Sequence, residues 1–165
     1  MERAVRVLAV LGASQPTAVE YETAREVGAL AARWGWAVLT GGGAGVMEAA
    51  SRGAAEAGGL TIGVLPGTEP AEDYPNRWVA IRIYTGLGSA RNVINALSGD
   101  LVLAIGGRAG TLSEVAHAVK AGREVWWYRP WGLTPPEGHP EPRLRRFGSR
   151  EELLEALRER LEEPH

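Results

Sequence analysis

The sequence AIGGRAGTLSEVAHAV, residues 104–119, changes from an apolar run to a helical pattern through a glycine-rich turn. Gly106, Gly107 and Gly110 lie in the turn, and Thr111 and Glu114 open the helical part. Glycine tolerates positive φ and lets a ligand approach the backbone closely. A strand, such a turn and a helix in this order predict one unit of a parallel α/β sheet.

The same order recurs along the chain. Most of the apolar runs are continuous, as expected for parallel strands that are covered on both faces. Helical patterns that end in glycine lie between them. We expect strands at 4–12, 36–43, 60–67, 78–86, 100–107 and 124–130, and helices at 17–35, 44–59, 89–99 and 109–122. The pattern predicts an α/β, Rossmann-like, doubly wound, mainly parallel sheet with helices on both faces.

The C-terminal part differs from the repeated pattern. We interpret the whole chain, residues 1–165, as a single Rossmann-like domain, with a strap at 130–148 and a C-terminal helix at 149–163 packed on it. Proline density argues against regular structure in the strap. Ser149 and Glu152 have capping-box spacing, and four leucines form one apolar stripe on the helix. A dimer contact is the alternative role for this stripe.

Composition limits the function classes. The formal net charge is −2, which gives no support to a nucleic-acid or membrane-surface partner. The chain has no cysteine, which excludes disulfides and thiolate chemistry and fits a reducing cytosol. No secretory signal pattern and no run of about 20 apolar residues is present. We therefore expect a cytoplasmic protein.

Five glycine-containing loops follow predicted strands, and we call them together the strand-end rim: residues 11–16, 40–45, 65–70, 84–91 and 106–111. In a sheet of this kind ligands bind at the carboxyl ends of the strands, where helix N-termini present free N–H groups to anions. The alternative is that the glycines only make tight turns. No Rossmann G-x-G-x-x-G and no P-loop motif occurs. Candidate phosphate-binding residues are Ser14, Gly42, Gly43, Gly45, Gly107, Arg108, Ala109, Gly110 and Thr111.

Arg91 and Glu114 are the candidate catalytic pair. Both are expected near the strand-end rim, where an arginine and a carboxyl group can position a ligand and move protons. A structural ion pair is the alternative. Glu114 and His117 have the E-x-x-H spacing of di-iron bundles, but one copy does not make such a site, and we expect no metal site in the protein itself.

Several motifs together resemble the Lonely Guy (LOG) and molybdenum-cofactor-carrier superfamily, whose members were formerly labelled possible lysine decarboxylases. The resemblance rests on TGGGAGVMEAASRGAAEAGGLTIGVLPG, YTGLGSARN and IGGRAGTLSEVAHAVKAGREV, in this order over about residues 5–128. The LOG branch has the motif P-G-G-x-G-T-x-x-E. This chain has Gly106 in place of the proline and Arg108 in place of the second glycine, and so it looks closer to the carrier-like branch.

The resemblance implies a Rossmann-like fold, usually in a homodimer or higher homo-oligomer, and two functions. One is binding of a phosphorylated nucleotide-like molecule, either AMP-like or a molybdopterin-type cofactor, without any required cofactor. The other is a phosphoribohydrolase that releases free base from nucleoside 5′-monophosphates, in which Arg91 and Glu114 would act. A lysine decarboxylase needs a Schiff-base lysine, and the only lysine, Lys120, is expected far from the rim.

Overall fold

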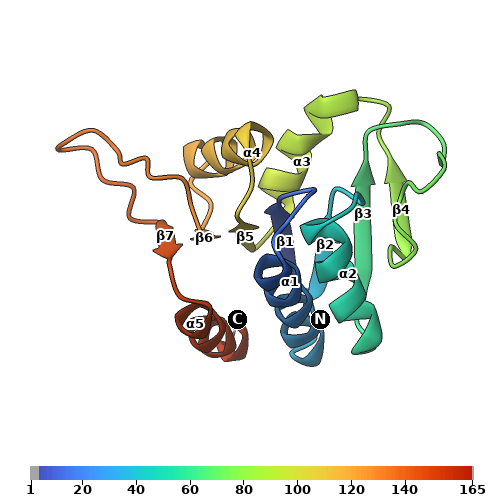
Figure 1. The fold of residues 1–165 in the computed structure, drawn as a ribbon, viewed down its shortest axis with the longest axis horizontal. Coiled ribbons are helices and arrows are strands. Elements are labelled where there is room, and N and C mark those ends of the chain that lie inside the picture. The colour runs from blue at the N-terminus through green and yellow to red at the C-terminus, as the bar shows by residue number, and fades with distance from the viewer. Residues whose placement is uncertain (1–3, 165) are drawn as a thin grey trace.

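The computed structural model describes residues 4–164, which form one seven-stranded sheet with five α-helices (Figure 1). The strand order is β4-β3-β2-β1-β5-β6-β7, and every strand pairs in parallel with its neighbours. This confirms the predicted Rossmann-like α/β class. The strands are β1 Val7–Gly12, β2 Ala37–Thr40, β3 Thr61–Leu65, β4 Ile81–Tyr84, β5 Leu101–Ile105, β6 Val125–Tyr128 and β7 Leu144–Phe147.

The helices cover both faces of the sheet. They are α1 Ala18–Arg33, α2 Val46–Glu56, α3 Arg91–Ser98, α4 Ala109–Lys120 and α5 Arg150–Glu162, with a short 3-10 turn at Gly88–Ala90. One core cluster joins the sheet to α1, α2 and α5, and a second joins it to α3 and α4. Figure 1 separates the same two groups, with α3 and α4 in the upper half. None of the described helices is long and apolar enough to cross a membrane.

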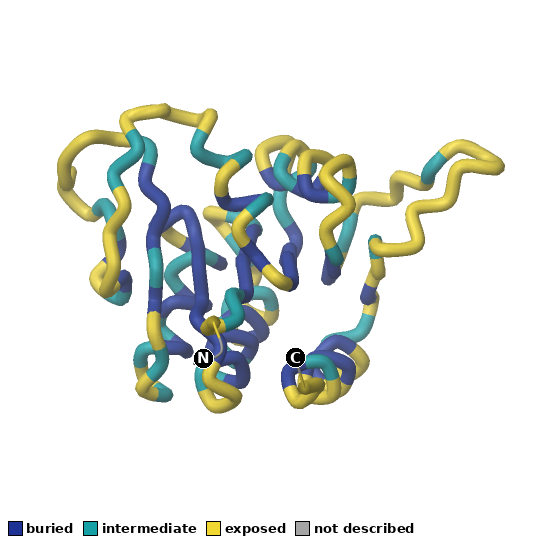
Figure 2. Tube along the Cα trace, turned by 180° about the vertical axis from the view of Figure 1, so that it is seen from behind, coloured by how far each residue is buried: buried dark blue, intermediate teal, exposed yellow. Residues whose placement is uncertain are grey.

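Continuous apolar sequence explains the central strands. All five residues of β5 are buried, as are the middle residues of β1, since helices cover both of their faces. Figure 2 shows this buried centre, with exposed residues in the outer loops and in the segment between β6 and β7. The structure therefore has a rigid, dry sheet beneath the loops that follow its carboxyl ends.

Local signals fix the helix ends. Thr17 and Glu20 form a complete capping box at the start of α1. At α5 the Ser149 hydroxyl accepts a hydrogen bond from the Glu152 backbone N–H. The predicted leucine stripe of α5 is buried against the sheet: Leu153, Leu154, Leu157 and Leu161.

The predicted strap, 130–148, is wrong in its last part, where β7 adds a parallel strand beside β6. Leu144 and Phe147 turn toward the protein, while Arg145 and Arg146 are exposed. An edge strand needs only partial burial. The two central arginines of β7 interrupt its apolar sequence, so it does not form the continuous apolar run that marks the other strands. The remaining strap extends away from the rest of the molecule (Figure 1).

Helices α1 and α2 touch through glycine. A Cβ atom on Gly53 would overlap the backbone oxygen of Arg25, and one on Gly28 would overlap that of Ala50. The backbones can therefore approach closely only because both positions lack side chains. This contact fixes the two helices that follow the first two loops of the strand-end rim.

Candidate functional site

The five loops of the strand-end rim follow the carboxyl ends of β1 to β5, as the sequence predicts. A cavity of about 190 Å³ lies between the loops after β1 and β5. The lining residues lie at and beyond the carboxyl ends of β1 and β5, which are neighbours in the sheet. From these two strands the chain connections lead to opposite sides of the sheet, and this is the usual ligand position in a doubly wound sheet. The lining residues are Gly12, Ala13, Ser14, Gln15, Arg108, Gly110, Thr111 and Glu114.

The loop between β5 and α4 offers a row of free donors. The backbone N–H groups of residues 107–111 donate to no other described residue, and α4 begins at Ala109. Gly106 and Gly107 have φ values of 57° and 99°, and a Cβ on Gly107 would overlap the Thr111 side chain. Consecutive free N–H groups at a helix start form a concave, electropositive surface that suits an anion.

The triple-glycine loop after β2 is held by residues that the sequence reasoning missed. The Asn76 side-chain amide donates to the carbonyl oxygens of Gly42 (3.2 Å) and Gly43 (2.9 Å). The Tyr74 hydroxyl donates to the carbonyl of Gly41, and burial raises the pKa of this phenol. No sequence motif marks Tyr74 or Asn76, because both come from an irregular loop after β3 and act through backbone groups.

Arg91 lies at the start of α3 and reaches into the sheet end. Its Nη1 donates to the carbonyl oxygens of Gly41 at 2.6 Å and of Val64 at 2.9 Å. Its Nε is buried and has no hydrogen-bond partner among the described residues. The guanidinium therefore links the loop after β2 to β3 and keeps an unused donor at its buried Nε.

Glu114 lines the cavity from one turn inside α4. Burial raises the pKa of its carboxyl to about 7, and the positive charge of Arg91 opposes that rise. No ion pair joins Glu114 to any residue that the structure describes, so Arg91 acts through space at longer range. A carboxyl group with a pKa near 7 can both hold and give up a proton at neutral pH.

The structure groups some predicted site residues and separates others. Ser14, Arg108, Gly110, Thr111 and Glu114 line one cavity, with Gly107 and Ala109 adjacent in the same loop. The remaining glycines, Gly42, Gly43 and Gly45, lie outside that lining.

These three glycines have structural roles. Gly42 and Gly43 belong to the loop that Asn76 holds. Gly45 packs so closely under the loop after β1 that a Cβ would meet the carbonyl oxygen of Ser14 at 2.6 Å.

Lys120 is exposed in the last turn of α4, a helix length of about 16 Å from the rim.

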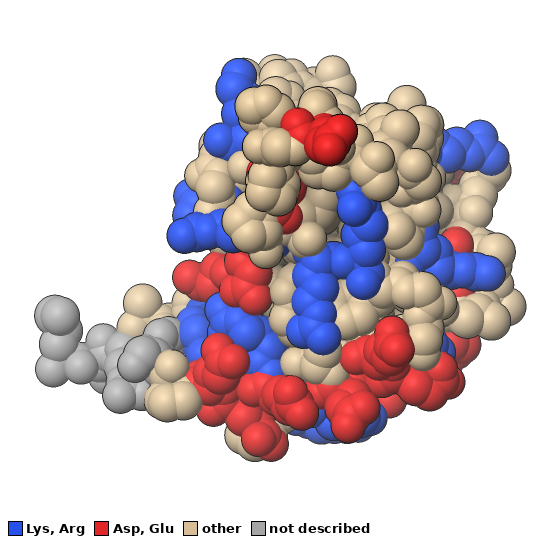
Figure 3. Space-filling model, turned by 90° about the vertical axis from the view of Figure 1, so that its left-hand side faces the viewer, with Lys and Arg blue, Asp and Glu red and all other residues tan. Residues whose placement is uncertain are grey.

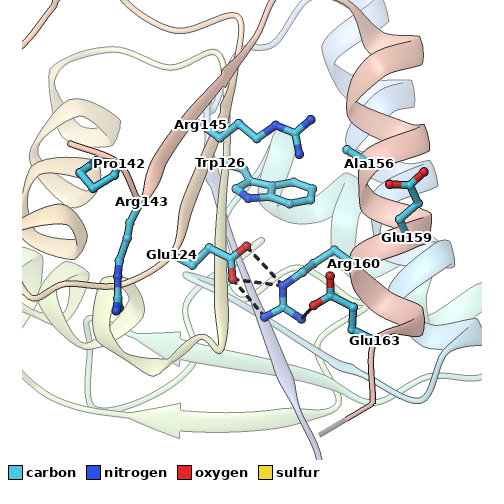
Figure 4. A pocket seen from close by; sticks show the side chains of 9 residues that line it. All are labelled: Glu124, Trp126, Pro142, Arg143, Arg145, Ala156, Glu159, Arg160 and Glu163. Atoms are coloured by element: carbon cyan, nitrogen blue, oxygen red, sulfur yellow. Dashed lines mark hydrogen bonds and ion pairs between the residues drawn. The ribbon is translucent and has the colours of Figure 1, made fainter. Parts of the chain in front are cut away.

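A larger cavity, about 610 Å³, lies between β6, β7 and α5 (Figure 4). It opens near the amino end of β6, whereas the strand-end rim lies at the carboxyl ends of the strands. Arg160 pairs there with Glu124 at 3.0 Å and with Glu163 at 3.6 Å. Figure 3 views this end of the molecule and shows arginine and glutamate side chains beside one another. These balanced charges stabilise the contact of α5 with the sheet edge.

No group of three or more metal-ligating His, Asp or Glu side chains occurs within residues 4–164. The functional groups at the strand-end rim are thus backbone N–H donors, hydroxyl groups, Arg91, Arg108 and the carboxyl group of Glu114.

Comparison with known proteins identifies related chains. The model of the SLOG cluster4 family matches residues 5–156. An uncharacterized protein of Archaeoglobus fulgidus is 41% identical over 123 residues, which cover 74% of this chain and 80% of the relative.

Two solved structures of similar length share the fold. The molybdenum cofactor binding protein of Rippkaea orientalis is 36% identical, with a TM-score of 0.81 over 97% of this chain and 99% of that one. The molybdenum cofactor carrier protein of Chlamydomonas reinhardtii is also 36% identical, with a TM-score of 0.78 over 94% of this chain and 98% of its own.

Proposed function

The chain belongs to the SLOG cluster4 family, and we propose that it binds and carries a phosphorylated, nucleotide-like small molecule, with a molybdopterin-type cofactor as the favoured cargo. The observation that carries the proposal is the row of free N–H groups at residues 107–111 beside a cavity. The names of the two similar solved proteins support a cofactor-binding role.

The phosphate of the ligand would lie against the loop between β5 and α4. Backbone donors and the positive end of the α4 dipole favour a doubly charged group there. The Arg108 guanidinium and the hydroxyl groups of Ser14 and Thr111 border the same cavity and add donors.

The volume of the cavity determines which part of the ligand it can enclose. Its volume of about 190 Å³ is below the roughly 300 Å³ at which ordinary ligand pockets begin. It is therefore large enough for the phosphate end and too small for the whole ligand. The planar part would extend over the neighbouring loop after β2, where Tyr74 and Arg91 meet the carbonyl of Gly41.

The test is a binding titration with AMP and with a phosphorylated pterin cofactor, monitored by calorimetry. We expect saturable binding, at one site per chain, that weakens at least tenfold in the Arg108→Ala variant. The Arg123→Ala variant is the matched control, because Arg123 is exposed after the far end of α4. Absence of binding to the unaltered protein would overturn the proposal.

A phosphoribohydrolase is the second candidate, favoured by the capacity of Glu114 to hold a proton within the electrostatic reach of Arg91. In that reaction water adds to the anomeric carbon, the N-glycosidic bond breaks, and the departing base nitrogen takes a proton. Glu114 would activate the water and Arg91 would orient the substrate. Release of free adenine from AMP that disappears in Glu114→Ala would favour this function, and binding without release would favour the carrier.

We also propose a cytoplasmic, single-domain protein that self-associates as a homodimer or higher homo-oligomer. The single continuous sheet supports one domain, and the absence of cysteine suits a reducing compartment. Ile81 and Ile83 on the edge strand β4 are 44% and 46% exposed, and Ile94 on α3 is 37% exposed. A second copy covering these side chains would remove apolar surface from water. Light scattering of the Ile83→Asp variant tests this, with a shift to monomer expected.

A further inference from the structure

Two tryptophans hold consecutive carbonyl groups of the loop between β5 and α4. The indole Nε1 of Trp127 donates to the carbonyl oxygen of Gly106 at 2.9 Å. That of Trp131 donates to the carbonyl oxygen of Gly107 at 3.0 Å. Trp127 is buried within β6, whereas Trp131 lies at the base of the strap and is 38% exposed.

These contacts determine where the backbone N–H groups point. In a trans peptide the C=O of one residue and the N–H of the next point in opposite directions. With the Gly106 carbonyl fixed on Trp127, the Gly107 N–H faces away from β6. With the Gly107 carbonyl fixed on Trp131, the Arg108 N–H faces away from the strap. Neither N–H donates to another described residue.

Contacts on both sides of Trp131 fix the base of the strap. Arg129 donates to the Thr17 hydroxyl at 3.2 Å and pairs with Glu20 at 3.5 Å. The carbonyl of Leu133 accepts a hydrogen bond from Arg146 of β7. Trp131 therefore lies between two anchors, one at the start of α1 and one on the edge strand.

We propose that Trp131 is a positioning residue for the anion site, because its indole N–H turns the Gly107–Arg108 peptide so that the Arg108 N–H faces the phosphate. This inference rests on the proposed function and extends it to the strap. The strap base is then part of the binding machinery although it contributes no contact to the cavity lining. Among the described residues of the strap, only the Trp131 indole donates to this loop, so its position sets the affinity for the phosphorylated ligand.

The test compares Trp131→Phe with Trp34→Phe by titration with AMP and with inorganic phosphate. Phenylalanine keeps an aromatic ring but has no N–H group. Trp34 caps the C-terminus of α1, is 46% exposed, and its indole donates to no described residue, which makes it a matched control. We expect about fivefold weaker binding of both probes to Trp131→Phe, the effect of one neutral hydrogen bond, with a melting temperature lower by only about 2–4 °C.

A second readout is independent of affinity. The amide proton resonance of Arg108 in the unliganded protein should shift in Trp131→Phe and stay unchanged in Trp34→Phe, since only the former releases the peptide. Tight binding to the unaltered protein with equal affinity in Trp131→Phe would overturn the positioning role alone. Failure of the unaltered protein to bind either probe would overturn the proposed function together with this inference.

Discussion

Replacement of Glu114 by Gln tests the electrostatics of the cavity through stability. The carboxyl has a pKa of about 7 in the folded chain, against an ordinary value of 4.5. Between these values the folded chain binds more protons at this site than the unfolded chain does, so the free energy of unfolding falls as the pH rises. Above pH 7 the full penalty of the buried charge is present. Glutamine is neutral at every pH and carries no such penalty.

The size of the effect follows from the two pKa values. Their difference corresponds to about 3 kcal/mol, and partial exposure of the side chain reduces what we expect to about 2 kcal/mol. Glu114→Gln should therefore be more stable than the unaltered protein by about 2 kcal/mol at pH 8 and nearly equal to it at pH 4.5.

Urea denaturation at the two pH values measures this difference. Glu155→Gln, a change at an exposed residue of α5, is the control and should alter stability little at either pH. An equal effect of Glu114→Gln at both pH values, or a destabilisation at pH 8, would contradict the raised pKa of Glu114. The first result would mean that the pKa of Glu114 is the same in the folded and the unfolded chain, and the second that an unseen partner stabilises its charge.

Three further changes test the supports of the site by thermal and urea denaturation. Asn76→Ala removes the donor of the buried Gly43 carbonyl, while the Gly42 carbonyl keeps the backbone N–H of residue 76, and it should cost about 1–3 kcal/mol; no loss would mean that the triple-glycine loop does not depend on this side chain. Gly53→Ala forces α1 and α2 apart and should cost about 1–3 kcal/mol, whereas Gly148→Ala, with open space around it, should cost little. Leu157→Ala empties a fully buried position under the sheet and should cost about 2–5 kcal/mol; a near-zero effect would show that α5 is not docked.

The architecture could be predicted because its signals are local. Continuous apolar runs and C-terminal glycines mark six strands and the helices between them, and the hydroxyl of Ser149 marks the start of α5. The strand β7 was not predicted, because only two of its side chains turn inward and its exposed arginines interrupt the apolar pattern. The length and hydropathy of apolar runs therefore suffice to predict the central strands of a parallel sheet, but not its edge strands.

The candidate site was predictable where it depends on chain position. Parallel strands carry their following loops to one edge, which brings Ser14 and Glu114 to one cavity from distant parts of the sequence. Asn76, Tyr74 and Trp131 were not predictable as site supports, because they act on backbone carbonyls of other loops. Such contacts depend on the final placement of irregular segments, for which the sequence carries no periodic signal.

The proposed function requires that the loop between β5 and α4 receives the phosphate of the ligand. Amide chemical shifts of the labelled protein during titration with AMP test this placement. We expect the N–H resonances of Gly107, Arg108, Ala109 and Gly110 to shift most, with saturation at a single site. Shifts confined to the cavity between β7 and α5, or no shift in residues 107–111 at saturating AMP, would contradict it.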